Sequence, residues 1–143
     1  MTQASTASPT ASRTVSPTVS LSIAEAAEAS GLSAYTLRYY EQIGLIAPID
    51  RRSGARRYSD ADMRWLDFLV RLRATGMSMQ AMQRYAQLLR QGNAASSLVE
   101  RQAMLEEHAA QLEADIRAQR ETLQYIRKKI RLYEEMRAEP KRA

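Results

Sequence analysis

The sequence predicts a mainly α-helical protein, with a head of short helices, a small β-hairpin within that head, and one long C-terminal helix. Three observations support this class. Serine caps and glycine stops divide residues 20–90 into short helical segments. An arginine-rich stretch with a Ser-Gly turn interrupts these segments, which is typical of a hairpin. Residues 97–136 contain neither glycine nor proline, and Pro140 ends this run.

The two ends of the chain are expected to lie outside the folded part. Residues 1–18 are almost entirely Ser, Thr, Ala, Pro and Gln, a composition too poor in apolar surface to form a core. We therefore expect a disordered tail there. Residues 137–143 follow the long helix and are expected to form a short, flexible basic tail.

Two short helices are predicted at the start of the head. Ser22 and Glu25 have the spacing of a capping box, which begins the first helix, and Gly31 suits the position just past its end. Ser33 caps the second helix, which covers residues 34–42. The apolar face of this second helix consists of Leu37, Tyr40 and Ile43. Two short helices joined by a turn that contains glycine outline a helix-turn-helix.

A basic hairpin is predicted after the second helix. Residues 45–49 form a short extended segment, residues 52–54 form the turn, and residues 55–58 return as the second strand. The whole chain is only moderately basic, with 21 Lys and Arg against 16 Asp and Glu. The local arginines are Arg38, Arg51, Arg52, Arg56 and Arg57. A cluster of this kind indicates a nucleic-acid partner better than the net charge does.

Two further helices complete the head. The third begins at residues 59–62, where Asp62 occupies the N3 position with a charge that suits the helix dipole, and Gly76 ends it. Its apolar stripe comprises Met63, Trp65, Leu66, Leu69 and Val70. Ser78 caps the fourth helix, and residues 91–93 break the chain after it. The apolar residues of the fourth helix are Met79, Met82, Tyr85, Leu88 and Leu89. This helical spacing predicts that both helices bury one face.

The long helix carries a heptad pattern. At about 1.5 Å per residue, residues 97–136 span on the order of 60 Å, which is too long for a small head to bury along one face. One heptad position holds Leu105, Leu112, Gln119, Ile126 and Tyr133, and the other holds Ala109, Ile116, Leu123 and Ile130. Because nearly all of these residues are apolar, we expect a coiled coil between two copies of the chain, with Gln119 as a polar residue that fixes the register. The alternative is a tail folded back on itself as a helical hairpin.

Several blocks of the head resemble the MerR family of regulators. Residues 22–46 are similar to the opening segment of that family, and the sequence TLRYYE at residues 36–41 is its most diagnostic part. The sequence GARRYS at residues 54–59 resembles the family's wing, and residues 66–79 resemble the paired helices behind it. The resemblance covers residues 20–90.

The tail is also similar to one branch of this family. Residues 100–133 resemble the short tails of the AdhR-like and NmlR-like regulators. The resemblance implies a winged helix-turn-helix domain at residues 20–90 that binds DNA, followed by a coiled-coil dimerisation helix at residues 97–136. It further implies a dimer on a palindrome within an overlong promoter spacer, with antiparallel tails joining two heads that bend and untwist the DNA. The residues expected to form the dimer are Leu105, Ala109, Leu112, Ile116, Leu123, Ile126, Ile130 and Tyr133.

The expected DNA contacts follow from the second helix acting as a recognition helix. The residues expected to enter the major groove are Ser33, Ala34, Tyr35, Thr36 and Arg38. The Arg38 guanidinium suits a guanine edge or a phosphate. The residues expected to contact mainly phosphates are Tyr39, Arg51, Arg52, Arg56 and Arg57, and the alternative for the arginines is a solvated basic surface. Tyr58 is a further candidate contact, but core packing is the favoured role for Tyr40 and Tyr58.

Other kinds of site find little support in the sequence. There is no cysteine and only one histidine, which argues against disulfides, thiolate metal sites and thiol sensing. Met77, Met79 and Met82 carry soft metal-binding sulfurs, but their helical spacing favours core packing. His108 is expected at the surface or in the seam, with a pH-dependent switch as the alternative. No catalytic constellation is present, so we expect no enzyme, cofactor or metal.

These observations predict a dimeric, sequence-specific transcription regulator. Because no apolar run approaches the roughly 18 residues of a membrane span and no signal peptide is visible, we expect a cytoplasmic location. The expected partners are promoter DNA, a second copy of the chain and RNA polymerase. A small-molecule effector would bind in a crevice between the tail and the third and fourth helices. The alternatives are an architectural DNA-bending protein that senses nothing and a coiled-coil interaction protein whose head no longer binds DNA. The arginine cluster argues against the last of these.

Overall fold

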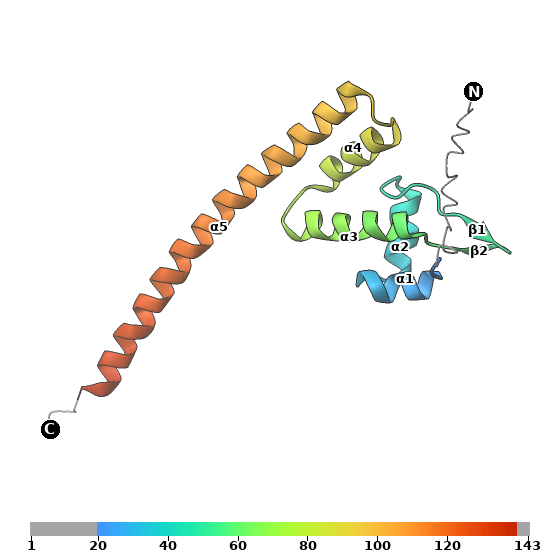
Figure 1. Cartoon of the computed structure of the whole chain (residues 1–143). Helices are drawn as coiled ribbons and strands as arrows, with labels where there is room; N and C mark the ends of the chain where they lie inside the picture. Colours follow the sequence, from blue (N-terminus) through green and yellow to red (C-terminus); the bar gives the residue numbers. More distant parts are fainter. Residues whose placement is uncertain (1–19, 140–143) are drawn as a thin grey trace, which may run out of the picture. The chain divides into compact units, whose positions relative to one another are not determined.

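A computed structural model describes residues 20–139 of the chain and is mainly helical, as predicted. The elements are α1 (Ile23–Ser30), α2 (Ala34–Gln42), β1 (Arg51–Arg52), β2 (Ala55–Arg56), α3 (Asp60–Ala74), α4 (Met79–Arg90) and α5 (Ala95–Ala138) (Figure 1). The tail predicted at residues 1–18 lies outside the described residues. Of the basic tail predicted at residues 137–143, residues 137 and 138 belong to α5, and residues 140–143 again lie outside the described part.

The chain divides into two compact units, with the boundary between Val70 and Arg71 inside α3. In the first unit, the predicted capping box of α1 is confirmed, because Ser22 Oγ accepts from the Glu25 N–H and the Ser22 N–H donates to Glu25 Oε1. Ser33 caps α2 in the same way through the Thr36 N–H, at 3.0 Å. The core of this unit contains Ala26, Leu37, Tyr40, Leu45, Ile46, Ile49, Tyr58, Leu66 and Leu69.

The hairpin begins later than the sequence predicted. The extended segment predicted at residues 45–49 forms no strand, and β1 consists of Arg51 and Arg52 instead. The prediction was wrong because the apolar side chains of residues 45, 46 and 49 are buried in a loop, and the Ile49 N–H bonds to a side chain of α2. Residues 53 and 54 alone form the turn, both with positive φ (52° and 80°), which is the geometry that a two-residue hairpin favours.

In the second unit, Ser78 caps α4 as predicted, through the Ala81 N–H at 3.1 Å. Met82, Ala86 and Leu88 are the buried residues of this helix. Leu89 was predicted on the buried face but is 41% exposed, whereas Ala86 is buried. No helix within residues 20–139 has both the length and the apolar character that crossing a membrane requires.

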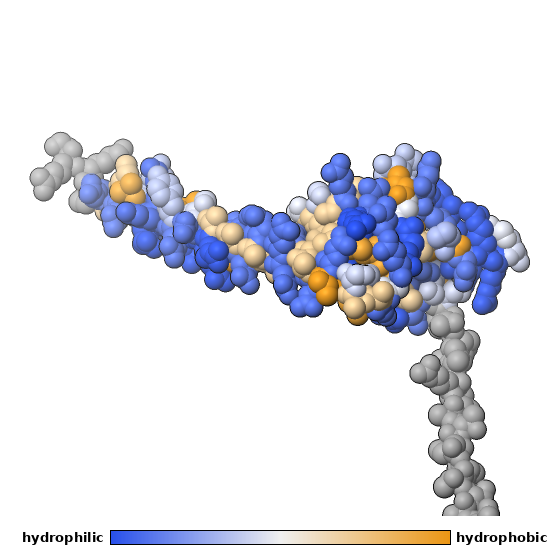
Figure 2. Space-filling model, turned by 90° about the horizontal axis from the view of Figure 1, so that it is seen from above, coloured by the Kyte–Doolittle hydropathy of each residue, from blue (hydrophilic) through white to orange (hydrophobic). Residues whose placement is uncertain are grey.

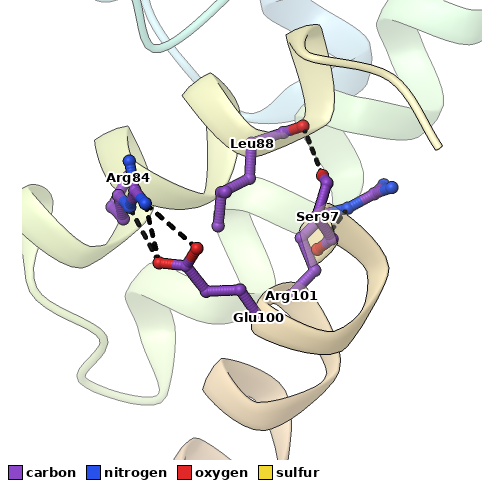
Figure 3. Close-up of polar contacts among 5 residues, drawn as sticks. All are labelled: Arg84, Leu88, Ser97, Glu100 and Arg101. Carbon is purple, nitrogen blue, oxygen red and sulfur yellow. Dashed lines mark hydrogen bonds and ion pairs between the residues drawn. The ribbon is translucent and has the colours of Figure 1, made fainter. Parts of the chain in front are cut away.

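The start of α5 is fixed to α4 by polar contacts (Figure 3). The guanidinium of Arg84 pairs with the carboxylate of Glu100, with the shortest N–O distance at 2.8 Å. Arg101 is only 8% exposed, and its Nη2 donates to Gly92 O and to Asn93 Oδ1, so it closes the loop between the two helices. The whole of α5 is one unbroken helix of 44 residues, from Ala95 to Ala138. The alternative of a tail folded into a helical hairpin is therefore wrong.

Candidate nucleic-acid interface

The exposed face of α2 carries aromatic and basic side chains. Tyr35 and Tyr39 are 75% and 46% exposed, and Arg38 is exposed between them. Because residues at i, i+3 and i+4 share one face of a helix, these three side chains form a continuous surface. The opposite face is buried through Leu37 and Tyr40, which confirms the core role favoured for Tyr40. Their burial determines which side of α2 remains available to a partner.

The first residues of α2 differ in how available they are. The Ser33 hydroxyl accepts from the Thr36 N–H and donates to the Thr36 hydroxyl, at 2.9 Å, so both side chains take part in the cap. Ala34 is half-buried. Gln42 was not among the predicted contacts, although it is exposed four residues after Arg38. The i, i+4 spacing from Arg38 places Gln42 on the same exposed face of α2.

The two arginines of β1 lie at the surface of the hairpin. Arg51 is exposed and its Nη1 donates to the Gly54 carbonyl oxygen, at 3.2 Å. Arg52 is exposed, and neither its side chain nor that of Arg38 makes a hydrogen bond or ion pair with any other residue in the described range 20–139. Arg38 and Arg52 are therefore the arginines of the cluster whose full donor sets remain available to an external anion.

Arg56 is held inside the protein by Glu41. The Arg56 Nε lies 2.8 Å from Glu41 Oε2, and the two side chains are 21% and 16% exposed. The other carboxylate oxygen of Glu41 accepts from the Ile49 N–H at 2.9 Å. Burial acts to raise the pKa of Glu41, but the hydrogen bonds from Ile49 and Arg56 and the nearby positive charges outweigh it, and the pKa lies below its ordinary value.

Arg57 and Tyr58 fix the base of the hairpin to the residues before α1. The Arg57 guanidinium donates to the hydroxyl and the carbonyl oxygen of Ser20, at 3.0 and 2.6 Å. Tyr58 and Leu21 exchange both backbone hydrogen bonds, each at 2.8 Å. The Arg57 N–H also donates to the Asp50 carbonyl oxygen. These contacts involve the two residues that directly follow β2, so the return of the hairpin has a fixed path.

The Tyr58 side chain lies in the core, so the prediction that it contacts DNA is wrong. It is fully buried, and its hydroxyl has no hydrogen-bond partner among residues 20–139. Burial raises the pKa of this hydroxyl, because the charged phenolate is poorly solvated there. The core alternative that the sequence favoured is therefore the correct one.

The other candidate site residues were three methionines and His108. Met77 and Met82 are buried and Met79 is half-buried, which agrees with core packing. His108 lies half-buried on α5, and its Nε2 is 2.7 Å from the Thr75 hydroxyl. A groove of about 590 Å³ lies beside it; its lining includes Met77, Ser78, Ala81, Met104, Glu107 and His108.

The predicted seam runs along one unbroken helix. Leu105 and Leu112 are half-buried, and Leu105 and Ala109 line a groove with Tyr85 of α4. The later seam residues are exposed in the single chain: Ile116, Leu123, Ile126, Ile130 and Tyr133, at 39% to 53%. Tyr125, Leu132 and Met136 are also exposed and lie outside the predicted seam. Figure 2 shows orange and pale-orange areas among the mainly hydrophilic surface of the long helix α5.

Comparison with known proteins gives consistent matches. Residues 21–89 match the model of the MerR HTH family regulatory protein, and residues 63–131 match that of the MerR DNA-binding region. An uncharacterised HTH-type transcriptional regulator of Haemophilus influenzae is 34% identical over 80% of this chain and 84% of its own length. The HTH-type transcriptional regulator AdhR of Bacillus subtilis is 42% identical over 51% of this chain, a match that spans about half (53%) of AdhR.

Among solved structures, the chain is similar to HiNmlR, described as a MerR family regulator that lacks the sensor domain and is bound to promoter DNA. The superposition has a TM-score of 0.76 at 32% sequence identity, and it covers 83% of this chain and 94% of the other. At this identity and coverage, the likeness concerns both the head and the long helix.

Proposed function

The chain belongs to the MerR family of DNA-binding transcription regulators, and on that premise we propose that it binds promoter DNA as a homodimer with α2 in the major groove. The observation that carries this proposal is the exposed face of α2, where Tyr35, Arg38 and Tyr39 lie side by side. A recognition helix reads base edges from such a face, and an arginine is the side chain that most often pairs with guanine.

The hairpin acts as the wing beside this helix. Its exposed arginines, Arg51 and Arg52, have the charge and reach that suit the phosphate backbone. Contacts of this kind supply affinity and position, whereas the recognition helix supplies sequence preference. The similarity to HiNmlR, whose structure contains promoter DNA, supports the proposal that this chain binds promoter DNA.

The homodimer forms through α5. Along 44 residues, this helix exposes a stripe of apolar seam residues that a single chain leaves in water. Its charges are segregated. Residues 100–115 contain Glu100, Glu106, Glu107, Glu113 and Asp115 against Arg101, and residues 117–131 contain Arg117, Arg120, Arg127, Lys128, Lys129 and Arg131 against Glu121. An antiparallel pair places the acidic half of each helix against the basic half of its partner, and a parallel pair would place like charges together.

The proposed dimer sits on a palindrome in a promoter spacer, where it bends and untwists the DNA in the presence of RNA polymerase. The groove beside His108 favours an effector-responsive regulator over an architectural protein, because a small molecule bound there would contact α4 and α5 together. A regulator of this kind has no need of catalytic residues, and none of its proposed contacts performs chemistry.

Selection of bound sequences from a randomised duplex library tests this function. The expected result is one enriched palindrome that the dimer binds far more tightly than a scrambled duplex of the same composition. Enrichment of no sequence, with equal binding to both duplexes, would contradict a sequence-specific regulator and favour the architectural alternative. Binding to neither duplex would favour the interaction-protein alternative.

A further inference from the structure

We propose that Glu41 is a positioning residue that fixes the wing to the recognition helix, and that Arg56 acts through Glu41 rather than as an independent phosphate contact. The functional half of this inference rests on the proposed DNA binding. It changes the role expected of Arg56, which the sequence grouped with the other wing arginines.

The geometry at Glu41 joins three segments. This residue lies on the last turn of α2, Ile49 lies just before β1, and Arg56 lies on β2. One oxygen of the carboxylate accepts from the Ile49 N–H at 2.9 Å, and the other accepts from Arg56 Nε at 2.8 Å. A single side chain of the recognition helix therefore holds both the entering and the returning limb of the hairpin.

Partial burial makes these contacts stronger than an ordinary surface ion pair. The Arg56 and Glu41 side chains are 21% and 16% exposed, so water screens them incompletely. Charge-assisted hydrogen bonds are stronger than neutral ones, and both oxygens of the carboxylate are used. Removing the carboxylate would also leave the Ile49 N–H without its acceptor next to the core.

The register of the hairpin separates the roles of its arginines. Arg51 pairs with Arg56 and Arg52 pairs with Ala55 across the two strands. Because successive side chains of a strand point to opposite faces, Arg52 lies on the face opposite to Arg56. The face with Arg56 is directed to Glu41, and the other face carries the arginine that no described residue engages. We therefore assign phosphate contact to Arg52 and wing orientation to Arg56.

A double-mutant cycle on DNA binding tests this division. The proteins are the wild type, Glu41→Gln, Arg56→Gln, the double variant and Arg52→Gln, and the probes are the duplex selected by the wild type and its scrambled form. Glu41→Gln keeps an oxygen for the Ile49 N–H but cannot form the ion pair. We expect either single change at residues 41 and 56 to weaken binding to the selected duplex by about tenfold, with no further loss in the double variant. The salt dependence stays that of the wild type in these three variants, whereas Arg52→Gln lowers its slope by about two, one for each wing of the dimer.

Additive losses, together with a salt slope that Arg56→Gln lowers by about two in both backgrounds (one for each wing of the dimer), would overturn the inference and make Arg56 a phosphate contact. Glu28→Gln is the matched control, because Glu28 is an exposed carboxylate on α1 and its removal changes the net charge equally. Thermal unfolding of each variant shows whether a loss of binding is only a loss of folded protein.

A measurement without DNA distinguishes failure of this inference from failure of the proposed function. In ¹⁵N relaxation of the free protein, Glu41→Gln should increase the fast motion of the Arg56 Nε–H and of the backbone amides at residues 52–55. The Arg57 amide, bonded to the Asp50 carbonyl oxygen, should stay rigid. Unchanged motion at Arg56 and residues 52–55 would refute the positioning role even if DNA binding is fully established. If the wild-type protein selects no sequence, the proposed function is refuted. The relaxation measurement would still test the structural role of Glu41.

Discussion

The hydroxyl of Ser97 donates to the carbonyl oxygen of Leu88 at 2.8 Å and so attaches the first turn of α5 to the last turn of α4. Ser97 is 4% exposed, so this hydrogen bond is shielded from water. Ser97→Ala should lower the free energy of unfolding by about 1 kcal/mol, because the carbonyl oxygen keeps only the weaker contact from the Gln91 N–H. Chemical denaturation at fixed protein concentration measures this loss. Ser96→Ala, at an exposed site on the same turn, is the control, and equal effects of the two changes would contradict a specific role for Ser97.

The Tyr58 hydroxyl gives a prediction of the opposite sign. It is buried without a hydrogen-bond partner among the described residues, so its desolvation is uncompensated. Tyr58→Phe should leave the melting temperature unchanged or raise it, by the equivalent of at most about 1 kcal/mol. Tyr58→Ala removes the whole ring from the core and should cost about 3–5 kcal/mol. A clear loss of stability in Tyr58→Phe would mean that the hydroxyl has a partner, such as an ordered water.

Stability should depend on pH through Glu41. The pKa of this group in the folded protein lies below the ordinary value of 4.5, so ionised Glu41 stabilises the fold at neutral pH. This contribution is fully present above pH 4.5 and is lost as the pH falls through the lowered folded pKa. The stability difference between the wild type and Glu41→Gln should therefore be constant from pH 7 to about 5 and shrink at lower pH. Urea denaturation across this range measures it, and a difference that does not shrink in acid would contradict the assignment.

The seam of α5 predicts that dimerisation and operator binding fail together. Ile116→Asp combined with Leu123→Asp places two charges in the apolar stripe, which should give monomers in analytical ultracentrifugation and abolish tight binding to the selected duplex. The matched control is Ala118→Asp combined with Gln124→Asp, which adds the same charge on α5 outside the seam. If the seam variant remains dimeric, the heptad assignment is wrong.

Arg38 and Arg52 should differ in what they contribute to DNA binding. Arg38→Ala should cost about 1–3 kcal/mol on the selected duplex and much less on scrambled DNA, because a guanidinium on the recognition helix reads base edges. Arg52→Ala should weaken binding to both duplexes alike and lower the salt slope by about two, one for each wing of the dimer. Fluorescence anisotropy at several salt concentrations separates the two effects. A change in sequence preference in Arg52→Ala, with an unaltered slope, would mean that the wing reads bases or DNA shape.

The sequence predicted those features that depend on neighbouring residues. The caps at Ser22, Ser33 and Ser78 follow from spacings of three residues, and the structure confirms each of them. The exposed face of α2 follows in the same way from helical periodicity. The start of the hairpin was misplaced because an apolar run in a buried loop has the same composition as a short strand.

The roles of the wing arginines required the tertiary structure. Arg56 is 15 residues from Glu41 in the sequence, and Arg57 is 37 residues from Ser20. No local pattern indicates that either guanidinium is engaged within the protein, so a cluster of arginines appeared as a uniform basic surface. Which of these residues touch DNA stays a prediction.

The attachment of the wing to Ser20 and Leu21 matters for protein engineering. A truncated chain that begins at Ser22 would retain the sequence of every helix and strand, and its circular dichroism spectrum would change little. It would nevertheless lose the acceptors for the Arg57 guanidinium and the backbone partner of Tyr58. A shortened version chosen from helix boundaries alone would thus remain folded and carry a loosened wing, so a minimal DNA-binding fragment has to include Ser20 and Leu21.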